Sequence, residues 1–433
     1  MAATTASRVN SQRKSGFRFT RKRILALTLI IIGILLIVSG YNKLDFDVTT
    51  TLTFAPGPIN SVPHIIVPTL SFMLVTGVIF ILTGILGVLD ITRIIGFVNG
   101  LMIVCGILII PSLFIIASAG GSTNLTTMLA ESLRLATPIA IGAMAGLWCE
   151  RSGVVNIAIE GMMLFGACFG FTALFYLRPV FGDQIEIAML LSVLIAVLTG
   201  GLVALLHAWL SITFATDQIV SGTVINILAL GVTSFVRREY LLSTEAGTIR
   251  LPEVRIPILA DIPIIGDVLF NNQPIFYMMF VIIIVSHLVL FHTRWGLRTR
   301  SVGEEPGAAD TLGVRVNRIR WTNVFIGGLI AGLAGAWFSL EATGRFDDGM
   351  TRGAGFIALA ALIFGKWAPL GALGGALLFG FSDSLGTRFQ IIGVEVPVQF
   401  LQMVPYIVTI VVLAGLIGKS VAPKALGTAY KKE

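Results

Sequence analysis

Long apolar runs are the feature that most limits what this chain can fold into. Runs such as 65–89 and 187–210 hold no Asp, Glu, Lys or Arg, and a helix of roughly 20 apolar residues crosses a bilayer. Only 12% of the 433 residues are charged, about half of the ~25% that is usual in soluble domains. So little charge cannot cover the surface of a soluble protein of this length. The sequence therefore predicts an all-α polytopic membrane protein and excludes a soluble enzyme or a nucleic-acid-binding protein.

We expect about ten membrane spans and one broken, re-entrant hairpin. The expected spans are 24–41, 65–89, 94–118, 129–149, 161–177, 187–210, 219–236, 275–293, 321–339 and 400–418. A glycine-rich stretch, 354–381, is split at Lys366–Pro369 into two pieces of about a dozen residues, each too short to span comfortably. We expect this hairpin to enter and leave on the same side, buried in protein or beside a wet cavity.

Basic residues indicate the orientation of the chain. Residues 1–23 contain seven Lys or Arg and no acid, and cytoplasmic segments of membrane proteins are enriched in these residues. With that start inside, the inner segments carry 20 of the 30 Lys and Arg, and both termini are expected in the cytosol. We interpret 1–120 as a basic N-terminus with three accessory spans, 121–418 as the working core, and 419–433 as a cytosolic basic tail.

The most unusual segment is Cys149–Gly161, which interrupts two apolar runs with polar and charged residues. Glu150, Arg151, Asn156 and Glu160 all lie in it. Charged side chains in membrane proteins are costly, and they usually face a cavity or find partners. Two interpretations stay open: a broken segment that lines a translocation path, or a short cytosolic loop whose charged ends reach the membrane surface.

Four other positions have both a functional and a structural interpretation. Asn226 lies in the middle of a span, where an amide commonly bonds a neighbouring helix. Asp217 precedes that span and is expected to cap its helix. Phe356 could line a path for a ring-shaped solute, although packing or interface anchoring is the more ordinary role of such an aromatic. Lys366 is expected to extend its amine to the membrane surface.

The longest inner loop, 294–320, predicts a short helix over 306–312. Ser301-x-x-Glu304 resembles a capping box. Pro306 suits a first helical position, and Gly313 suits the position just past the end of a helix.

This short helix predicts a docking element for a cytosolic partner. We expect Ala308, Ala309 and Leu312 to form one small apolar face. The alternative is a basic loop on anionic lipid head groups, which would explain the six arginines of the loop. It would not explain the capped apolar helix, so we favour docking.

The sequence contains no complete motif for nucleotide binding, metal binding or catalysis. Gly418-Lys419-Ser420 would need a glycine at Leu413 to complete a phosphate-binding loop. The four histidines and three cysteines form no metal-ligand pattern. We therefore expect no catalytic site, no metal and no cofactor.

Three segments resemble a known family. Glu150–Gly161 (ERSGVVNIAIEG), Trp295–Val316 and Gly353–Asp383 are similar to the membrane permeases of ABC-type importers in the branched-chain amino acid/ribose superfamily. The simple-sugar and nucleoside branch is the most similar, and the resemblance covers about 125–418. The first 120 residues depart from the pattern of that branch.

The resemblance implies a type II-like importer fold in a bacterial cytoplasmic membrane, and a pore-forming subunit for a nucleoside or simple sugar. It implies a separate cytosolic ABC ATPase, an extracytoplasmic solute-binding protein, and a second related permease or a second copy. The expected coupling residues are Gly303, Glu304, Ala308, Ala309, Asp310 and Gly313. The expected path residues are Asn156, Glu160, Gly161, Asn226 and Phe356. A competing hypothesis is an ion-coupled secondary transporter that uses Glu160 or Asp217 as its coupling carboxylate.

Overall fold

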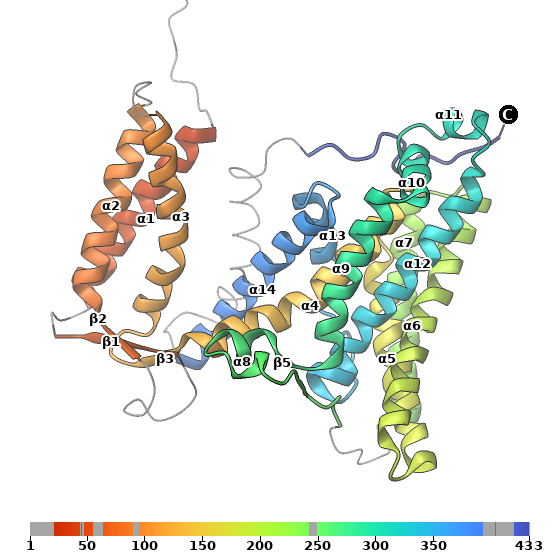
Figure 1. The fold of residues 1–433 in the computed structure, drawn as a ribbon, viewed down its shortest axis with the longest axis horizontal. Coiled ribbons are helices and arrows are strands. Elements are labelled where there is room, and N and C mark those ends of the chain that lie inside the picture. The colour runs from red at the N-terminus through yellow and green to blue at the C-terminus, as the bar shows by residue number, and fades with distance from the viewer. Residues whose placement is uncertain are drawn as a thin grey trace, which may run out of the picture. The chain divides into compact units, whose positions relative to one another are not determined.

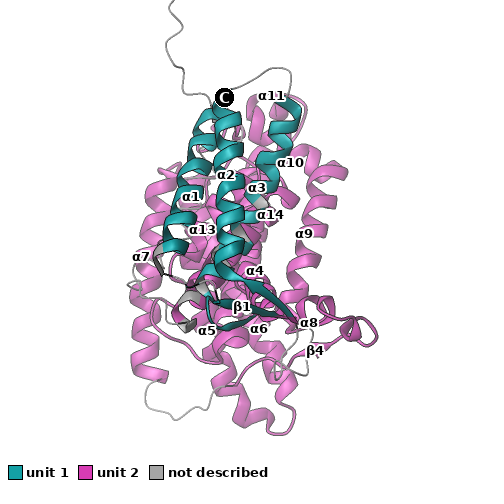
Figure 2. Ribbon diagram, turned by 90° about the vertical axis from the view of Figure 1, so that its left-hand side faces the viewer, with its two compact units in different colours: residues 1–52, 65–123, 414–416 teal, residues 53–64, 124–413, 417–433 magenta. Residues whose placement is uncertain are grey.

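The computed structural model describes residues 21–43, 45, 47–54, 64–89, 95–241, 249–392, 403 and 420–432. The chain forms two compact units, coloured separately in Figure 2. The first comprises 1–52, 65–123 and 414–416, and the second comprises 53–64, 124–413 and 417–433.

The first unit is built on three helices: α1 (Arg21–Lys43), α2 (Thr69–Leu89) and α3 (Ile95–Ala117). Gly33 of α1 and Gly77 of α2 permit a close approach, because a Cβ on Gly33 would lie 2.7 Å from the Gly77 carbonyl oxygen. Small residues have this role in membrane helix pairs. Three short strands, β1 (Thr49–Thr53), β2 (His64–Pro68) and β3 (Ser122–Asn124), pair in the order β2-β1-β3. The sequence analysis did not predict these strands.

The second unit contains the remaining helices. The long ones are α4 (Leu125–Glu150), α5 (Ile159–Phe181), α6 (Ile185–Ala208), α7 (Gln218–Val236), α9 (Pro274–His292), α12 (Val316–Ala336) and α14 (Pro369–Ile392). The shorter elements are β4 (Val254–Arg255), α8 (Ile265–Leu269), β5 (Asn271–Asn272), α10 (Arg294–Glu304), α11 (Pro306–Thr311) and α13 (Ala354–Phe364). π-Helical turns extend α6, α7 and α12 to Thr213, Leu241 and Thr343.

Helix α4 forms the centre of the second unit. It packs against α9, α12, α13 and α14 (Figure 1), and every residue from Ala136 to Glu150 is buried. Much of this stretch is alanine and glycine, so neighbouring helices can approach its backbone closely. The segment that follows α4 is therefore held inside the unit.

The structure confirms a polytopic helical membrane protein. Eight helices among the described residues are long and apolar enough to cross a membrane. The expected span 94–118 corresponds to α3. The expected span 400–418 lies outside the described residues, except for Met403.

The broken hairpin differs from the prediction in its second arm. Its first arm, α13, has 11 residues as expected, but α14 has 24, so the expectation of two short pieces was wrong. Lys366 and Trp367 form the turn between them with φ values of 54° and 52°. Ser382 and Asp383 follow the apolar part of α14, but the helix continues past them. Polar side chains do not end a helix when packing against neighbouring helices holds it.

Gly332 provides a test of the close contact between α6 and α12. A Cβ there would lie 2.3 Å from the Ala196 carbonyl oxygen, a clash with backbone that only a helix shift relieves. We expect Gly332→Ala to lower the free energy of unfolding in detergent by about 2–3 kcal/mol. Gly374→Ala is the control, since nothing lies within 4 Å of its Cβ position. Equal unfolding transitions for the two variants would contradict the packing.

Candidate substrate path and partner-docking surface

The break between α4 and α5 is a buried irregular segment, residues 151–158. The N–H of Val155 donates to Oε1 of Gln218 at 2.7 Å, and its carbonyl oxygen lies 3.0 Å from Nε2 of His207. Unpaired backbone groups are tolerated poorly inside a membrane protein. Side chains from α6 and α7 therefore hold the break in place.

Asn226 of α7 makes a second bridge to the break. Its Oδ1 accepts from the N–H of Gly161 at 2.7 Å, and its Nδ2 donates to the carbonyl oxygen of Ile157 at 2.9 Å. A Cβ on Gly161 would lie 2.9 Å from that Oδ1. The amide thus bonds the start of α5 rather than only a neighbouring side chain.

Replacing the Asn226 amide is expected to loosen the break. Asn226→Leu leaves a buried N–H and a buried carbonyl without partners, and we expect a loss of about 2–4 kcal/mol of unfolding free energy. Asn226→Asp keeps an acceptor for Gly161 and should lose less. Chemical denaturation in detergent measures both, and an unchanged Asn226→Leu protein would contradict the bridge.

Glu150 and Arg151 attach the break to the α13–α14 turn. Oε2 of Glu150 accepts from the indole Nε1 of Trp367 at 2.5 Å, and Nε and Nη2 of Arg151 donate to the Trp367 carbonyl oxygen at 2.9 and 2.6 Å. The Arg151 guanidinium also lies 5.4 Å from the ring centroid of Phe291. Glu150 is 5% exposed and Arg151 is half-buried, so the charged residues at the start of the break are bonded within the second unit.

The guanidinium of Arg151 lies near two charged side chains of α10, Glu304 and Arg300. Burial lowers the pKa of its guanidinium, Glu304 raises that pKa, and Arg300 lowers it further. Arg300 also stacks over Phe291, at 5.2 Å from the ring centroid. The start of the break thus lies beside the predicted docking loop.

Glu160 joins the first turn of α5 to the start of α13. Its Oε1 accepts from Oγ1 of Thr351 at 2.6 Å and from the N–H of Gly353 at 2.8 Å, and its Oε2 accepts from the N–H of Gly355 at 2.7 Å. A carboxylate at a helix N-terminus satisfies free N–H groups and complements the helix dipole. Gly355 permits this approach, because a Cβ there would lie 2.6 Å from the Glu160 Cα atom.

An open surface begins next to this junction. Phe356, on the first turn of α13, is 48% exposed. Helix α7 buries only one face, and exposes large apolar side chains elsewhere along its length. These side chains are Ile219, Val220, Val224, Ile227, Leu228, Leu230 and Phe235.

The predicted path residues therefore differ in position. Glu160, Gly161 and Asn226 form one bonded group, and Phe356 follows it on α13. Asn156 is 0% exposed, and its Nδ2 lies 3.3 Å from the Cys149 sulfur. In this structure Asn156 is enclosed within the break and does not face an open path.

Sequence reasoning missed Glu341, which repeats the arrangement of Glu160. It is 1% exposed, and its Oε2 accepts from the N–H of Ile275 at 2.8 Å, at the start of α9. The available signal was an acid two residues after the expected span 321–339.

The expected short helix of the inner loop is present as α11. Pro306 occupies its first turn, and Gly313 follows its end with a φ of 80°. The predicted capping box was wrong, because Ser301 lies inside α10 and bonds the carbonyl oxygen of Arg298. Helix α10 itself was missed. Thr293 caps it by accepting from the N–H of Gly296.

The predicted apolar face of α11 requires a correction. Leu312 is 85% exposed and Ala308 is exposed, but Ala309 is 3% exposed. Ala309 belongs to a small apolar cluster with Val302, Val316 and Ile319. It supports the loop from inside, and only its neighbours can meet a partner.

The other predicted coupling residues differ in how far they are exposed to solvent. Glu304 and Gly313 are exposed, and Asp310 is half-buried. Gly303 is buried against the break, where a Cβ would lie 2.3 Å from the carbonyl oxygen of Arg151. The predicted docking loop and the break are thus in direct backbone contact.

Comparison with known proteins identifies a permease family. The family described as "Branched-chain amino acid transport system / permease component" matches residues 128–413. The chain is 42% identical over 318 residues to the guanosine ABC transporter permease protein NupQ of Bacillus subtilis (71% of this chain, 97% of the relative). It is 40% identical over 316 residues to the nucleoside ABC transporter permease protein NupC of Lactococcus lactis (71% and 98%). It is 32% identical over 333 residues to a putative glucose ABC transporter permease protein of Haloferax volcanii (71% and 98%). No solved structure matches the chain.

Proposed function

From the premise that this chain belongs to the family of branched-chain amino acid transport permeases, we propose that it carries a nucleoside into the cell. It is a multi-pass membrane permease subunit of an ABC transporter, a transport component and not an enzyme. The alternative of an ion-coupled secondary transporter is wrong, because the relatives are ABC transporter permeases.

One observation carries the choice of solute. The two relatives at 42% and 40% identity are named for guanosine and nucleosides, whereas the one named for glucose is 32% identical. All three are matched over nearly their whole length. A nucleoside is therefore favoured over a simple sugar.

The proposed path runs past the junction of α5, α7 and α13. Phe356 offers an exposed ring beside the Glu160 group, and a nucleobase can stack on an aromatic side chain for about 1–3 kcal/mol. Glu160 and Asn226 position this region by fixing the ends of α5 and α13. The two carboxylates of the ion-coupled hypothesis have structural roles in this structure: Glu160 bonds the start of α13, and Asp217 caps α7.

The proposed partners follow from the two ends of the second unit. A cytosolic ATPase docks on α10–α11, and a solute-binding protein docks at the opposite end, which includes 249–272. The broad open face of α7 supports a pore formed with a second permease, related or identical. We propose that both termini lie in the cytosol, a proposal that the basic segment 1–23 supports.

The first three helices are proposed to be accessory to the permease core. The family match begins at residue 128, after α3. An odd number of added spans allows a core that starts outside to follow a cytosolic N-terminus. Residues 121–418 then form the core, and 419–433 form its cytosolic tail.

Uptake into sealed vesicles tests the proposal. The vesicles contain this chain, its ATPase and any second permease, with ATP inside and the binding protein outside, where labelled guanosine is added. We expect ATP-dependent uptake that unlabelled nucleosides inhibit and glucose does not. No guanosine uptake in vesicles that take up labelled glucose with ATP would overturn the nucleoside assignment and leave the permease assignment intact.

A further inference from the structure

The C-terminal segment 420–432 packs on the inner end of the second unit. The N–H of Ala425 donates to the carbonyl oxygen of Gly303 at 2.9 Å, and the N–H of Gly427 donates to that of Gly153 at 3.1 Å. The carbonyl oxygen of Thr428 accepts from Nη1 of Arg320 at 2.8 Å. The segment is thus bonded to α10, to the break and to α12.

Side chains strengthen the attachment of this segment to the docking loop. Tyr430 packs against the apolar cluster that encloses Ala309. Nζ of Lys432 lies 3.3 Å from Asp310 of α11, and Nζ of Lys424 lies 3.6 Å from Glu305. Single exposed ion pairs contribute little stability, but the hydrogen bonds and Tyr430 fix the position independently of them.

The result is a continuous surface with a defined chemistry. Leu312, Ala308 and Ala429 are exposed on it. Besides the buried Arg320, the segments 294–320 and 420–432 together hold eight basic and three acidic residues, and two of the three acids already pair with tail lysines. Such a surface is complementary to an apolar pocket with an acidic rim.

We propose that the C-terminal segment 424–432 and α11 form one composite docking surface for the ATP-hydrolysing partner. The inference rests on the proposed partner and deepens it. The ATPase contacts the tail as well as α11, and its contact surface presents an apolar pocket for Leu312 surrounded by carboxylates. The tail is then a docking element and not a free end.

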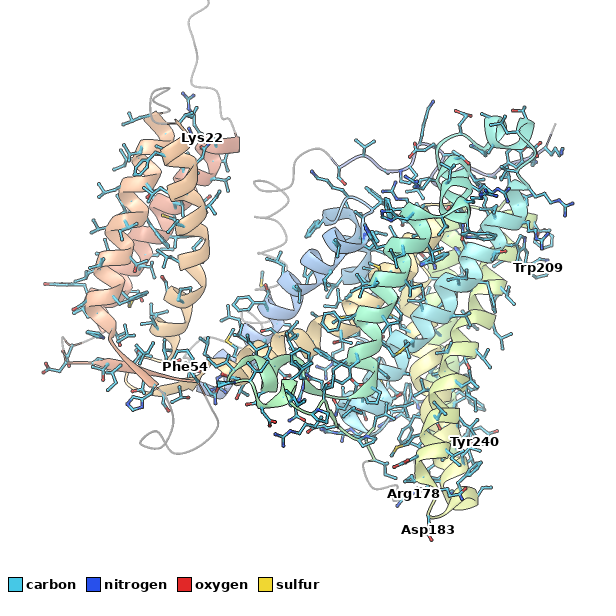
Figure 3. All side chains as sticks on the ribbon, in the orientation of Figure 1. Lys22, Phe54, Arg178, Asp183, Trp209 and Tyr240 are labelled. Carbon is cyan, nitrogen blue, oxygen red and sulfur yellow. The ribbon has the colours of Figure 1, made fainter. Side chains whose placement is uncertain are left out.

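The native cysteines make a direct test possible, because all three are free and buried. A cysteine introduced at an exposed position is therefore the accessible thiol. We would prepare Leu312→Cys, Ala429→Cys and the control Asp183→Cys. Asp183 lies in the turn between α5 and α6, at the end of the second unit opposite α11 (Figures 1 and 3).

Labelling by a water-soluble maleimide is measured in nanodiscs of zwitterionic or anionic lipid, with and without the ATPase. We expect the ATPase to slow labelling at Leu312→Cys and Ala429→Cys at least tenfold in both lipids, and to leave Asp183→Cys unchanged. A maleimide crosslinker should also join the ATPase to both protected positions.

Three results would overturn the inference in distinguishable ways. Protection of Leu312→Cys without Ala429→Cys would limit docking to α11. Protection of Ala429→Cys by anionic lipid without ATPase would assign the tail to the membrane surface. Protection of neither position in a complex that still transports would place the docking site elsewhere. If no complex forms and the reconstituted set shows no ATP-dependent uptake, the proposed function fails together with the inference.

Discussion

Replacing Leu312 with glutamate is expected to abolish ATP-dependent uptake while leaving the purified permease as stable as the parent protein. The side chain is 85% exposed, so the substitution should change the free energy of unfolding by less than about 0.5 kcal/mol. Full burial of a leucine side chain in a partner's pocket contributes about 2 kcal/mol, and a buried carboxylate facing an acidic rim adds repulsion. We expect at least a 30-fold weaker association with the ATPase, measured by co-purification and by uptake.

Two further variants define what this result means. Val180→Glu adds the same charge at an exposed position near the end of α5 and should leave association unchanged. Ala309→Arg should instead lower the stability of the permease itself, because Ala309 is enclosed by Val302, Val316 and Ile319 and a charge there has no solvent. Normal association and full uptake by Leu312→Glu would remove α11 from the docking surface.

Glu160→Gln is expected to reduce uptake at least tenfold by releasing the start of α13. The carboxylate accepts three hydrogen bonds, two of them from backbone N–H groups at that helix start. A glutamine amide can accept only through its oxygen, and its NH₂ group then faces an N–H donor. The loss of one charge-assisted bond and of the favourable dipole interaction should cost about 2–4 kcal/mol of unfolding free energy. Denaturation in detergent and vesicle uptake measure the two effects.

Glu186→Gln is the matched control, since Glu186 is exposed in the first turn of α6. We expect a change below about 1 kcal/mol there, from the dipole alone. If Glu160→Gln unfolds like the parent and transports normally, the junction of α5 and α13 does not position the path.

The glycine and charge patterns explain why parts of the site were predictable. The charges of Cys149–Gly161 are costly inside a membrane protein unless they find partners, so the sequence marked this segment as unusual and left its position, path or cytosolic loop, open. Asp217 caps α7 as expected, accepting from the N–H groups of Ile219 and Val220. These features depend on local chemistry, which neighbouring residues in the sequence determine.

Partners distant in the sequence were beyond such reasoning. Trp367 bonds Glu150 across 217 positions, and Gly355 bonds Glu160 across 195. The face of α11 was predicted from helical spacing alone, and spacing could not indicate that Tyr430 and α12 would cover Ala309. The second arm of the hairpin was expected to be short because the glycine-rich stretch was taken to end at residue 381, whereas α14 continues to Ile392.

The sequence by itself determined that this chain is a helical membrane permease with a broken segment and a short helix in the loop 294–320. Long apolar runs, punctuated by charges, glycine and proline, constrain the backbone locally, and each such constraint can be derived from a short stretch. Only the tertiary structure decided which side chains close the break, which face of α11 meets solvent, and that the C-terminal segment joins the docking loop. Those outcomes depend on which helices pack together, because the hydrogen-bond partner of a buried polar group lies on a helix that is distant in the sequence.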